Sequence, residues 1–193
     1  MAEKSPKSPA RTRVLDTATR LFYAEGVHTV GIDRIIAEAG VAKATFYHHF
    51  PAKDALVLAY LEEQSRMQQE AAAQLTADGP REKVLAVFDR MGQIGALEDF
   101  RGCPFINTAA EYPDAAHPVR KAVDAYRDWF RGLMRDLLDE AGVPGPDAER
   151  TADLLLLIRD GLTVACNIDT PAMPRPLVRD AVLRVLEGTP VGV

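Results

Sequence analysis

The stretch GVAKATFYHHF, residues 40–50, concentrates side chains that can coordinate metals, transfer protons or bind phosphate. His48 and His49 are adjacent, so on a helix they point about 100° apart and are poorly placed to bind one metal ion. The HExxH spacing of helical zinc sites is also absent from the sequence. Lys43 and Tyr47, in contrast, carry groups that donate hydrogen bonds to phosphate oxygens. The stretch therefore favours contact with a polyanion, and we expect neither a metal ion nor another cofactor.

Two short helices meet at this stretch. Apolar residues recur at helical spacing over 32–39 and stop at Gly40, and residues 42–49 form a second short helix. An earlier apolar face, residues 14–22, predicts a longer first helix that ends near Ala24. Two short helices separated by a glycine and docked on a third are typical of a helix-turn-helix, whose second helix enters the DNA major groove.

The aromatic residues of the second short helix are expected to anchor it. Phe46, His49 and Phe50 lie at positions i, i+3 and i+4, on one side of the helix. A helix of this length is not stable without such packing, so we expect this face to lie on the first two helices. An ordinary amphipathic core helix would also explain the aromatics, but it gives no role to the polar residues between them.

Proline and glycine divide the rest of the chain into further helices. A long connecting helix is predicted after Pro51, with a stop at residues 78–80. The remaining predicted helices cover residues 81–97, 104–112, 118–140, 147–168 and 176–187. No segment alternates as a strand would. The sequence thus predicts an all-α fold of about nine helices, with an N-terminal three-helix DNA-binding head followed by a C-terminal helical domain.

Charge is distributed unevenly over the 193 residues. Residues 1–53 hold eight Lys or Arg and five Asp or Glu, a balance of +3, whereas the remainder carries −8 and the whole chain −5. We therefore expect a disordered basic tail at 1–10, a DNA-binding domain at 11–53, and a second domain with different partners at 54–193.

The protein is expected to be cytoplasmic and not associated with a membrane. Cys103 and Cys166 lie far apart and suggest neither a disulfide framework nor a zinc site. The longest aliphatic run, Leu154–Ile158, has five residues, whereas a membrane span needs about 20. No apolar leader follows the first charged residues.

The sequence GIDRIIAEAGVAKATFYHHFPAKDAL, residues 31–56, resembles the DNA-binding head of the TetR family of bacterial transcriptional regulators, and the similarity extends over residues 11–60. The resemblance implies that the helical domain at 54–193 is a ligand-binding and dimerisation domain. It also implies a homodimer that represses transcription until a small-molecule effector releases it from DNA. Family members commonly have a hydroxyl residue where this chain has Val30, and we expect Thr29 to replace it as a helix cap. The candidate DNA-binding residues are Arg11 and Arg13, as a basic arm, Thr29, Gly31, Ile32, Lys43, Ala44, Thr45, Tyr47 and His48, with Lys53 on a phosphate.

The last two predicted helices carry wide apolar faces. A helix that is apolar nearly all round must be covered on both sides, so we expect the homodimer to form through these two helices. The apolar residues of the last helix are Leu177, Val178, Ala181, Val182, Val185 and Leu186. Two heads related by a two-fold axis would bind a palindromic double-stranded DNA operator, with half-sites about 34–36 Å apart.

A small apolar or amphipathic effector is expected to bind in the second domain. The short helix after Pro104 mixes large apolar surface with polar groups, as a ligand pocket does, although aromatic residues at this spacing are as often part of a core. The candidate ligand-binding residues are Phe88, Met91, Cys103, Phe105, Asn107, Glu111, Tyr112, Tyr126, Trp129 and Phe130.

The sequence leaves three alternatives to the ligand-responsive regulator. A small helical enzyme could use Glu111, His117 and Cys103, but the sequence contains no nucleotide-binding, nucleophile-elbow or metal motif, and we assign no catalytic residue. Cys103 could alternatively act as a redox sensor, because a helix start lowers the pKa of a thiol. A structural adaptor is a third possibility, which the uneven charge and the front motif disfavour.

Overall fold

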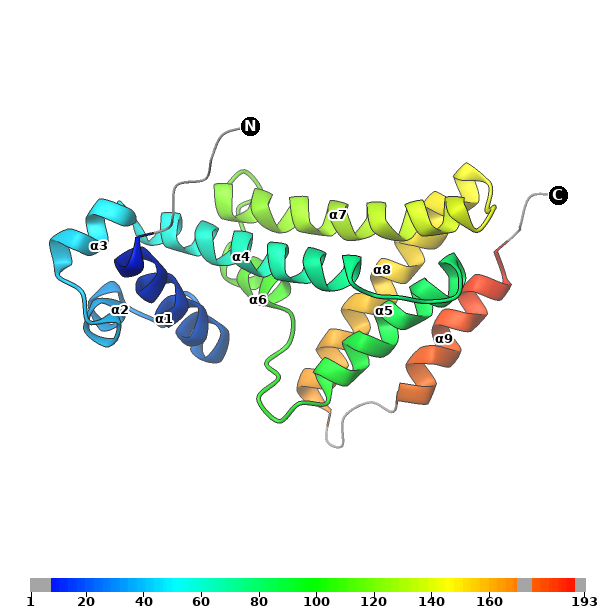
Figure 1. Cartoon of the computed structure of the whole chain (residues 1–193), viewed down its shortest axis with the longest axis horizontal. Helices are drawn as coiled ribbons and strands as arrows, with labels where there is room; N and C mark the ends of the chain where they lie inside the picture. Colours follow the sequence, from blue (N-terminus) through cyan, green and yellow to red (C-terminus); the bar gives the residue numbers. More distant parts are fainter. Residues whose placement is uncertain (1–7, 170–174, 190–193) are drawn as a thin grey trace. The chain divides into compact units, whose positions relative to one another are not determined.

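The computed structural model describes residues 8–169 and 175–189, which form nine α-helices and no β-strand (Figure 1). The helices are α1 (Pro9–Glu25), α2 (Ile32–Ala39), α3 (Lys43–His49), α4 (Lys53–Ala73), α5 (Pro80–Gly95), α6 (Pro104–Glu111), α7 (Pro118–Glu140), α8 (Gly145–Ile168) and α9 (Arg175–Glu187). The predicted all-α fold is confirmed.

Several helix ends differ from the sequence-based prediction by one or two residues, and the end of α4 differs by more. The helix α1 begins at Pro9, because a proline in the first turn has no amide hydrogen to leave unpaired, so the last two residues of the predicted tail are helical. The other residues of that tail, 1–7, lie outside the described residues. The helix α4 ends at Ala73, before the predicted stop, and the chain then closes a final turn in which the Leu75 amide donates to the Ala72 carbonyl.

The chain forms two compact units. The first comprises the described residues up to Arg66 together with Asn107–Val123, and the second comprises Met67–Ile106 and the described residues from Asp124 onward. The sequence placed the domain boundary at residue 53, whereas the units divide inside α4. The reason is that α4 is one continuous helix with no break signal, and its N-terminal half packs into the first unit.

The core of the first unit contains one apolar face from each of its first four helices. Phe46 of α3 has no exposed surface and Phe50, which follows α3, is 2% exposed. Phe22 and Tyr60 meet edge to face, with ring centroids 5.7 Å apart. The other buried residues are Val14, Leu15, Ala18 and Leu21 of α1, Ile35 and Ala39 of α2, and Leu56, Val57, Ala59 and Leu61 of α4.

The turn between α2 and α3 depends on Gly40. This residue adopts φ +61°, in the left-handed region that glycine occupies without steric cost, and its amide donates to the carbonyls of Ile36 and Ala37 at the end of α2. The start of α2 differs from the prediction that Thr29 caps it. The N-cap residue is Gly31, and no side chain caps the helix, so the negative charge of Asp33 in the first turn is the favourable feature at this end.

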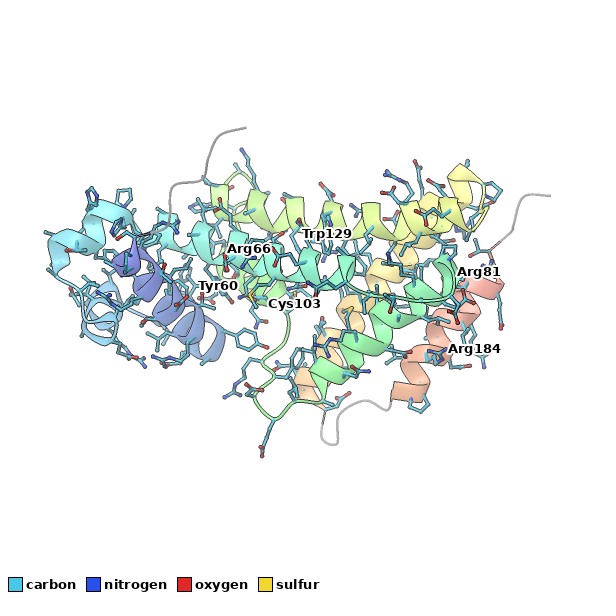
Figure 2. All side chains as sticks on the ribbon, viewed as in Figure 1. Tyr60, Arg66, Arg81, Cys103, Trp129 and Arg184 are labelled. Carbon is cyan, nitrogen blue, oxygen red and sulfur yellow. The ribbon has the colours of Figure 1, made fainter. Side chains whose placement is uncertain are left out.

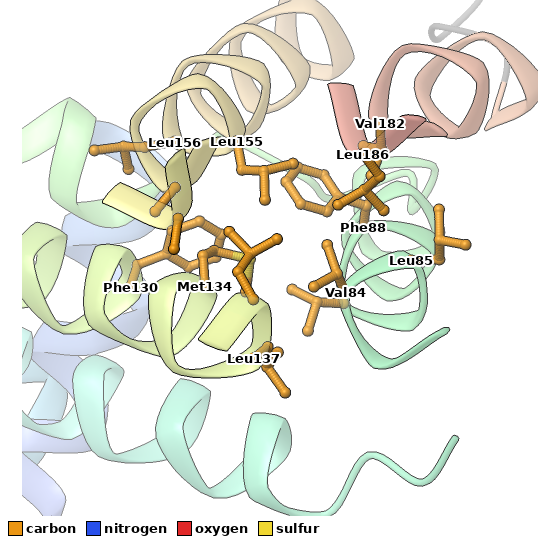
Figure 3. Packing of buried hydrophobic residues seen from close by; sticks show 14 of the residues in the cluster. Val84, Leu85, Phe88, Phe130, Met134, Leu137, Leu155, Leu156, Val182 and Leu186 are labelled. Carbon is orange, nitrogen blue, oxygen red and sulfur yellow. The ribbon is translucent and has the colours of Figure 1, made fainter. Parts of the chain in front are cut away.

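The core of the second unit is formed by α5, α7, α8 and α9. Figure 3 shows Val84 and Phe88 of α5 facing Leu155 of α8, with Met134 of α7 beside them. Phe88 and Phe130 pack edge to face at a centroid separation of 6.4 Å. Most of these side chains are less than 5% exposed, so this cluster is the main apolar core of the unit.

The apolar face of α9 is used inside the chain. Val178, Val182 and Leu186 belong to the buried core against α5, while Leu177 remains 55% exposed. Arg81, at the start of α5, donates from Nη2 to the carbonyl of Leu186 (Figure 2). The sequence had assigned all of this face to a dimer interface, and most of it instead packs on a neighbouring helix that periodicity could not identify.

We expect Phe46→Ala to destabilise the first unit by about 3–5 kcal/mol, because a fully buried aromatic ring is replaced by a cavity. The measurement is thermal unfolding followed by circular dichroism. Tyr47→Ala is the matched control from the same helix, since its ring is 40% exposed and its loss should cost less than about 1 kcal/mol. Equal destabilisation by the two substitutions would contradict the assignment of Phe46 as the anchor.

Candidate nucleic-acid interface and effector cavity

The polar face of α3 lies in solvent. Lys43, Ala44, Tyr47 and His48 are exposed, and Thr45 is half-buried. These exposed residues occupy positions i, i+1, i+4 and i+5, which form one side of a helix, and Phe46 fixes the opposite side in the core. The burial of one aromatic side chain therefore determines which side chains face outward.

Lys43 is bound to the neighbouring helix of the motif. Its Nζ atom lies 3.1 Å from Oδ1 of Asp33, and this hydrogen bond raises the pKa of Lys43 above its ordinary value. The ammonium is thus charged and can exchange the carboxylate for a phosphate. Lys53, at the start of α4, donates to the carbonyl of His28 at 3.4 Å, and partial burial lowers its pKa.

Other cations of the head have partners within the fold. Arg34 donates to both Glu25 and Glu38, and these hydrogen bonds raise the pKa of Arg34 and lower that of Glu25. The pKa of Glu38 is lowered by hydrogen bonds from Arg20 and from Arg34. Arg20 also pairs with Glu38, at 2.5 Å. These ion pairs connect α1 to α2, so their role is to stabilise the packing of the two helices in the head.

Arg11 and Arg13 lie on α1. The guanidinium of Arg11 lies 5.1 Å from the centroid of the Phe50 ring, and Nε of Arg13 donates to the Ala39 carbonyl at 3.4 Å. A basic arm that enters a minor groove is extended. The prediction of an arm is therefore corrected, because Pro9 already starts a helix that includes both arginines.

Glu111, the last residue of α6, binds the turn between α1 and α2. Its Oε1 accepts a hydrogen bond from the Val27 amide at 2.8 Å, and its Oε2 accepts one from the His28 amide at 2.5 Å. Gly26 adopts φ +89°, and a Cβ atom there would lie 3.1 Å from Oε1 of Glu111. One carboxylate thus accepts hydrogen bonds from two backbone amides that have no partner within a helix. These amides lie in the segment that leads into α2, so the carboxylate fixes that segment. We call this contact the Glu111 clamp.

A second contact lies beside the Glu111 clamp. The Tyr112 hydroxyl donates to Oδ1 of Asp54 at 2.8 Å, and Nε2 of His117 lies 3.3 Å from Oδ2 of the same carboxylate. Partial burial, followed by the Asp54 hydrogen bond, raises the pKa of Tyr112. The Tyr112 ring lies between the rings of His28 and His117, at centroid distances of 5.0 and 4.9 Å. These contacts attach the segment after α6 to the start of α4.

The second unit contains a largely apolar cavity of about 90 Å³ between α4, α5 and α7. Trp129, a residue of α7 that is labelled in Figure 2, forms part of its wall. The lining residues are Gln68, Ala71, Ala72 and Leu75 of the α4 segment, Val87, Arg90, Met91 and Ile94 of α5, and Tyr126, Trp129, Phe130 and Leu133 of α7. A cavity walled by aromatic and aliphatic side chains with few polar groups is typical of a small-molecule site.

A buried arginine lies behind the aromatic wall of the cavity. Arg159 of α8 is 2% exposed, and its Nη2 donates to the Tyr126 hydroxyl at 3.2 Å and to Sγ of Cys103 at 3.1 Å. Burial by itself disfavours its charge, but Cys103, Tyr126 and Asp160 outweigh that effect and raise the pKa of Arg159. The Phe105 ring stacks on Tyr126 at a centroid distance of 3.6 Å.

One face of α8 is apolar and exposed. Leu154, Leu157, Val164 and Ile168 lie on this face, with Gly161 in the middle, so the spacing is three, four, three and four residues. Leu157 and Ile168 are 65% and 69% exposed. A seam with this spacing is the one through which helices pair in coiled coils. We call this set the α8 seam.

Comparison with known proteins assigns the family. The sequence model described as bacterial regulatory proteins of the tetR family matches residues 14–60, and the model of the LmrA/YxaF-like transcriptional regulator C-terminal domain matches residues 80–174. A crystal structure of a TetR-family transcriptional regulator from Streptomyces coelicolor is 42% identical and covers 93% of each chain, with a TM-score of 0.80. The chain belongs to the TetR family.

Named relatives of this TetR-family chain are also transcriptional regulators. The HTH-type transcriptional regulator LmrA of Bacillus subtilis is 27% identical over 172 residues, which are 85% of this chain and 91% of the relative. The HTH-type transcriptional repressor NemR of Escherichia coli is 26% identical over 125 residues, 63% of each chain. The chain is accordingly a DNA-binding transcriptional regulator, and its helix-turn-helix is α2 with α3.

Two kinds of feature are absent from the described ranges, 8–169 and 175–189. No group of three or more His, Cys, Asp or Glu residues there is placed to hold a metal ion. No helix in these ranges is both long enough and apolar enough to cross a membrane.

The predicted DNA-binding residues fall into two groups in this TetR-family structure. Those on α3, and Thr29, Gly31 and Ile32 around the start of α2, are at least partly accessible. Arg11, Arg13 and Lys53 also contact other parts of the head. Contact of either group with DNA stays a prediction.

The predicted ligand-binding residues are divided between different places. Met91, Tyr126, Trp129 and Phe130 line the cavity. Phe88 is in the main core, and Cys103 and Phe105 lie behind Tyr126. Asn107, Glu111 and Tyr112 belong to the first unit, where Glu111 and Tyr112 bind backbone amides and Asp54, so the predicted pocket on α6 is corrected. Their polar groups have partners in the fold, which the sequence could not show.

Sequence reasoning missed three important residues. Gln68 and Arg90 line the cavity, and Arg159 lies behind it. Arg159 had a signal, since an arginine that follows five aliphatic residues on a largely apolar helix must be either exposed or paired. Gln68 had none, because it lies in a polar part of α4.

We expect Lys43→Ala and Tyr47→Ala each to weaken operator binding by at least about tenfold, because each removes a donor to DNA from the exposed face of α3. Fluorescence anisotropy of labelled DNA over a range of salt concentrations provides the measurement. Loss of Lys43 should also reduce the slope of log affinity against log salt by about one per head. Lys121→Ala, an exposed lysine of α7, is the control, and an effect of the same size in that variant would refute the assigned interface.

We expect Glu111→Gln to weaken operator binding by about tenfold or more while the dimer persists, because the amide group can no longer accept from both Val27 and His28. The readouts are DNA affinity by anisotropy and mass by light scattering. Glu140→Gln replaces an exposed glutamate of α7 and should leave the affinity unchanged. Unchanged DNA affinity in Glu111→Gln would show that the clamp does not position the head.

Proposed function

We propose that this protein is a homodimeric repressor that works in the cytoplasm, binds a palindromic operator, and is released by a small apolar or amphipathic effector. The observation that carries the proposal is the exposed polar face of α3, held outward by the burial of Phe46. The repressor NemR, a relative of this chain, supports the direction of regulation.

The dimensions of α3 suit direct contact with DNA. Its seven residues span about 10 Å, and a major groove about 12 Å wide admits a helix. Lys43 offers a charge to a phosphate or a guanine edge, and Tyr47 offers a hydroxyl to the backbone. Ala44 has a small side chain that allows the helix to approach the base edges closely.

The homodimer is proposed to form through the α8 seam. Packing two such seams against each other would bury Leu157 and Ile168, the most exposed residues of the stripe, and Gly161 leaves open space in which the helices can approach. Leu177 of α9 extends the apolar surface. A second copy of the chain is the occupant that explains this surface, because one head makes few phosphate contacts and two heads bind half-sites cooperatively.

The apolar cavity is the proposed effector site. An effector that binds one conformation of the chain better than another shifts the population toward it, and release follows if that conformation spaces the two heads incorrectly for the operator. The α4 segment contributes four residues to the cavity wall. The same continuous helix begins at Lys53, directly after the helix-turn-helix.

The contacts of the candidate catalytic residues favour the regulator over an enzyme. Glu111 binds backbone amides and His117 pairs with Asp54, both within the first unit. Cys103 belongs to the second unit and is 5% exposed, and its sulfur accepts a hydrogen bond from Arg159. These contacts give all three residues a part in the architecture of the chain.

Binding of the purified protein to DNA from upstream of its own gene tests the repressor proposal. We expect a shifted complex whose affinity falls steeply as salt is raised, since phosphate contacts release condensed counterions. The complex should contain two copies of the chain per operator. Binding that does not depend on salt, or a complex with one copy, would contradict the proposal.

We expect Leu157→Glu to convert the dimer into a monomer and to weaken operator binding, because it places a charge within the proposed seam. Sedimentation or light scattering measures the mass. Met67→Glu is the matched control, since Met67 is 53% exposed on α4, outside the seam. A dimer that survives Leu157→Glu as well as Met67→Glu would place the interface elsewhere.

A further inference from the structure

Arg159, which is buried, and Arg127, which is partly exposed, together carry more positive charge than the one carboxylate that they share. Nη1 of Arg159 donates to Oδ1 of Asp160 at 2.6 Å, and Nη1 of Arg127 donates to Oδ2 of the same carboxylate at 2.7 Å. Two guanidinium groups thus share one carboxylate. A buried charge is unfavourable unless an opposite charge and hydrogen bonds compensate for it, so a site for a further negative charge near Arg159 would stabilise this arrangement.

Among the described residues, the other contacts of Arg159 are with a thiol, a hydroxyl and two aromatic rings, and none is with a second carboxylate. Its Nη2 donates to Sγ of Cys103 and to the Tyr126 hydroxyl, and its buried Nε atom has no hydrogen-bond partner. The guanidinium carbon lies 5.0 and 5.2 Å from the ring centroids of Tyr126 and Phe130. Burial raises the pKa of Tyr126 to about 12, so the phenol keeps its proton at neutral pH.

Tyr126 connects Arg159 to the cavity. Its hydroxyl accepts a hydrogen bond from Arg159 and donates its own hydrogen to Oε1 of Gln68, and both Tyr126 and Gln68 line the cavity. A hydroxyl that accepts from a cation is polarised and becomes a stronger donor. Arg90 also lines the cavity, where its Nη1 donates to Oε1 of Gln93. The Tyr126 hydroxyl is therefore the enhanced neutral hydrogen-bond donor of a largely apolar wall, and the side chain of Gln68 currently occupies the acceptor position.

We propose that the effector is a ring-sized, mainly apolar molecule with a carboxylate, which replaces Gln68 as the acceptor of the Tyr126 hydrogen bond. This inference rests on the proposed effector site and specifies the chemistry that it selects. The apolar part packs among Trp129, Phe130 and Leu75, and the carboxylate supplies negative charge close to Arg159. Displacement of Gln68 breaks a contact between the α4 segment and α7, which gives ligand binding a direct effect on the helix that begins at Lys53.

Trp129 allows binding at this site to be measured directly. It is the single tryptophan of the chain, and it lines the cavity. The full-length protein is titrated at neutral pH with benzoate, acetophenone and ethylbenzene, three probes of similar size that carry an anionic acceptor, a neutral acceptor and no acceptor. We expect benzoate to change Trp129 fluorescence at a concentration about tenfold lower than ethylbenzene, since a charge-assisted hydrogen bond is the stronger kind, and to release operator DNA.

Variants test whether Tyr126, Arg159 and Gln68 determine the preference for benzoate over ethylbenzene. Tyr126→Phe and Arg159→Gln should each remove the advantage of benzoate over ethylbenzene, and binding of ethylbenzene shows that each variant is still folded. Gln68→Ala removes the competing acceptor from a half-buried position and should tighten benzoate binding. Gln69→Ala, at the adjacent exposed position, is its control.

Several results would overturn the inference. Equal affinity for benzoate and ethylbenzene, tighter binding of acetophenone, or no fluorescence change with any probe would each exclude a carboxylate as the recognised group. Weaker benzoate binding in Gln68→Ala would exclude competition for Tyr126. The repressor proposal fails independently, in the operator and dimer measurements that use no probe.

Discussion

The structure of the head depends on burying one side of a helix that is too short to be stable alone. The helix α3 has seven residues, fewer than an isolated helix needs, so its conformation is maintained by Phe46 and by Phe50 directly after it. Since those aromatic rings occupy the core, Lys43 and Tyr47 must point away from it. The same packing that stabilises the helix therefore also presents the residues that can contact DNA.

Polar groups that are partly or fully buried mark the places where each unit is specified beyond simple apolar packing. In the first unit, the carboxylate of Glu111 accepts from two backbone amides and so fixes the segment before α2. In the second unit, Arg159 is enclosed by aromatic rings and shares the carboxylate of Asp160 with Arg127. Unmade hydrogen bonds of buried groups are costly, so both contacts restrict the conformations available to the chain. Their positions also make them suitable points at which a bound molecule could change the structure.

The two apolar faces of the second unit show that periodicity can predict a helix correctly without identifying the helix that packs against it. The faces of α8 and α9 were both visible in the sequence. In the structure, Val178, Val182 and Leu186 of α9 are covered by α5, whereas Leu157 and Ile168 of α8 remain exposed. A stripe of apolar residues indicates that a surface must be covered. It contains no information on whether the covering helix belongs to the same chain.

The sequence by itself determined the all-α fold, the approximate ends of nearly all the helices and the helix-turn-helix, because apolar spacing, Gly40 and the prolines act through local backbone geometry. Only the tertiary structure determined which groups the individual polar side chains contact. Glu111 and Tyr112 looked like pocket residues and instead bind backbone and carboxylate groups in the first unit, while Gln68 and Arg159 were not selected and surround the hydroxyl of Tyr126. These contacts join residues between 33 and 84 positions apart, and such pairings depend on how helices pack, which local spacing does not encode.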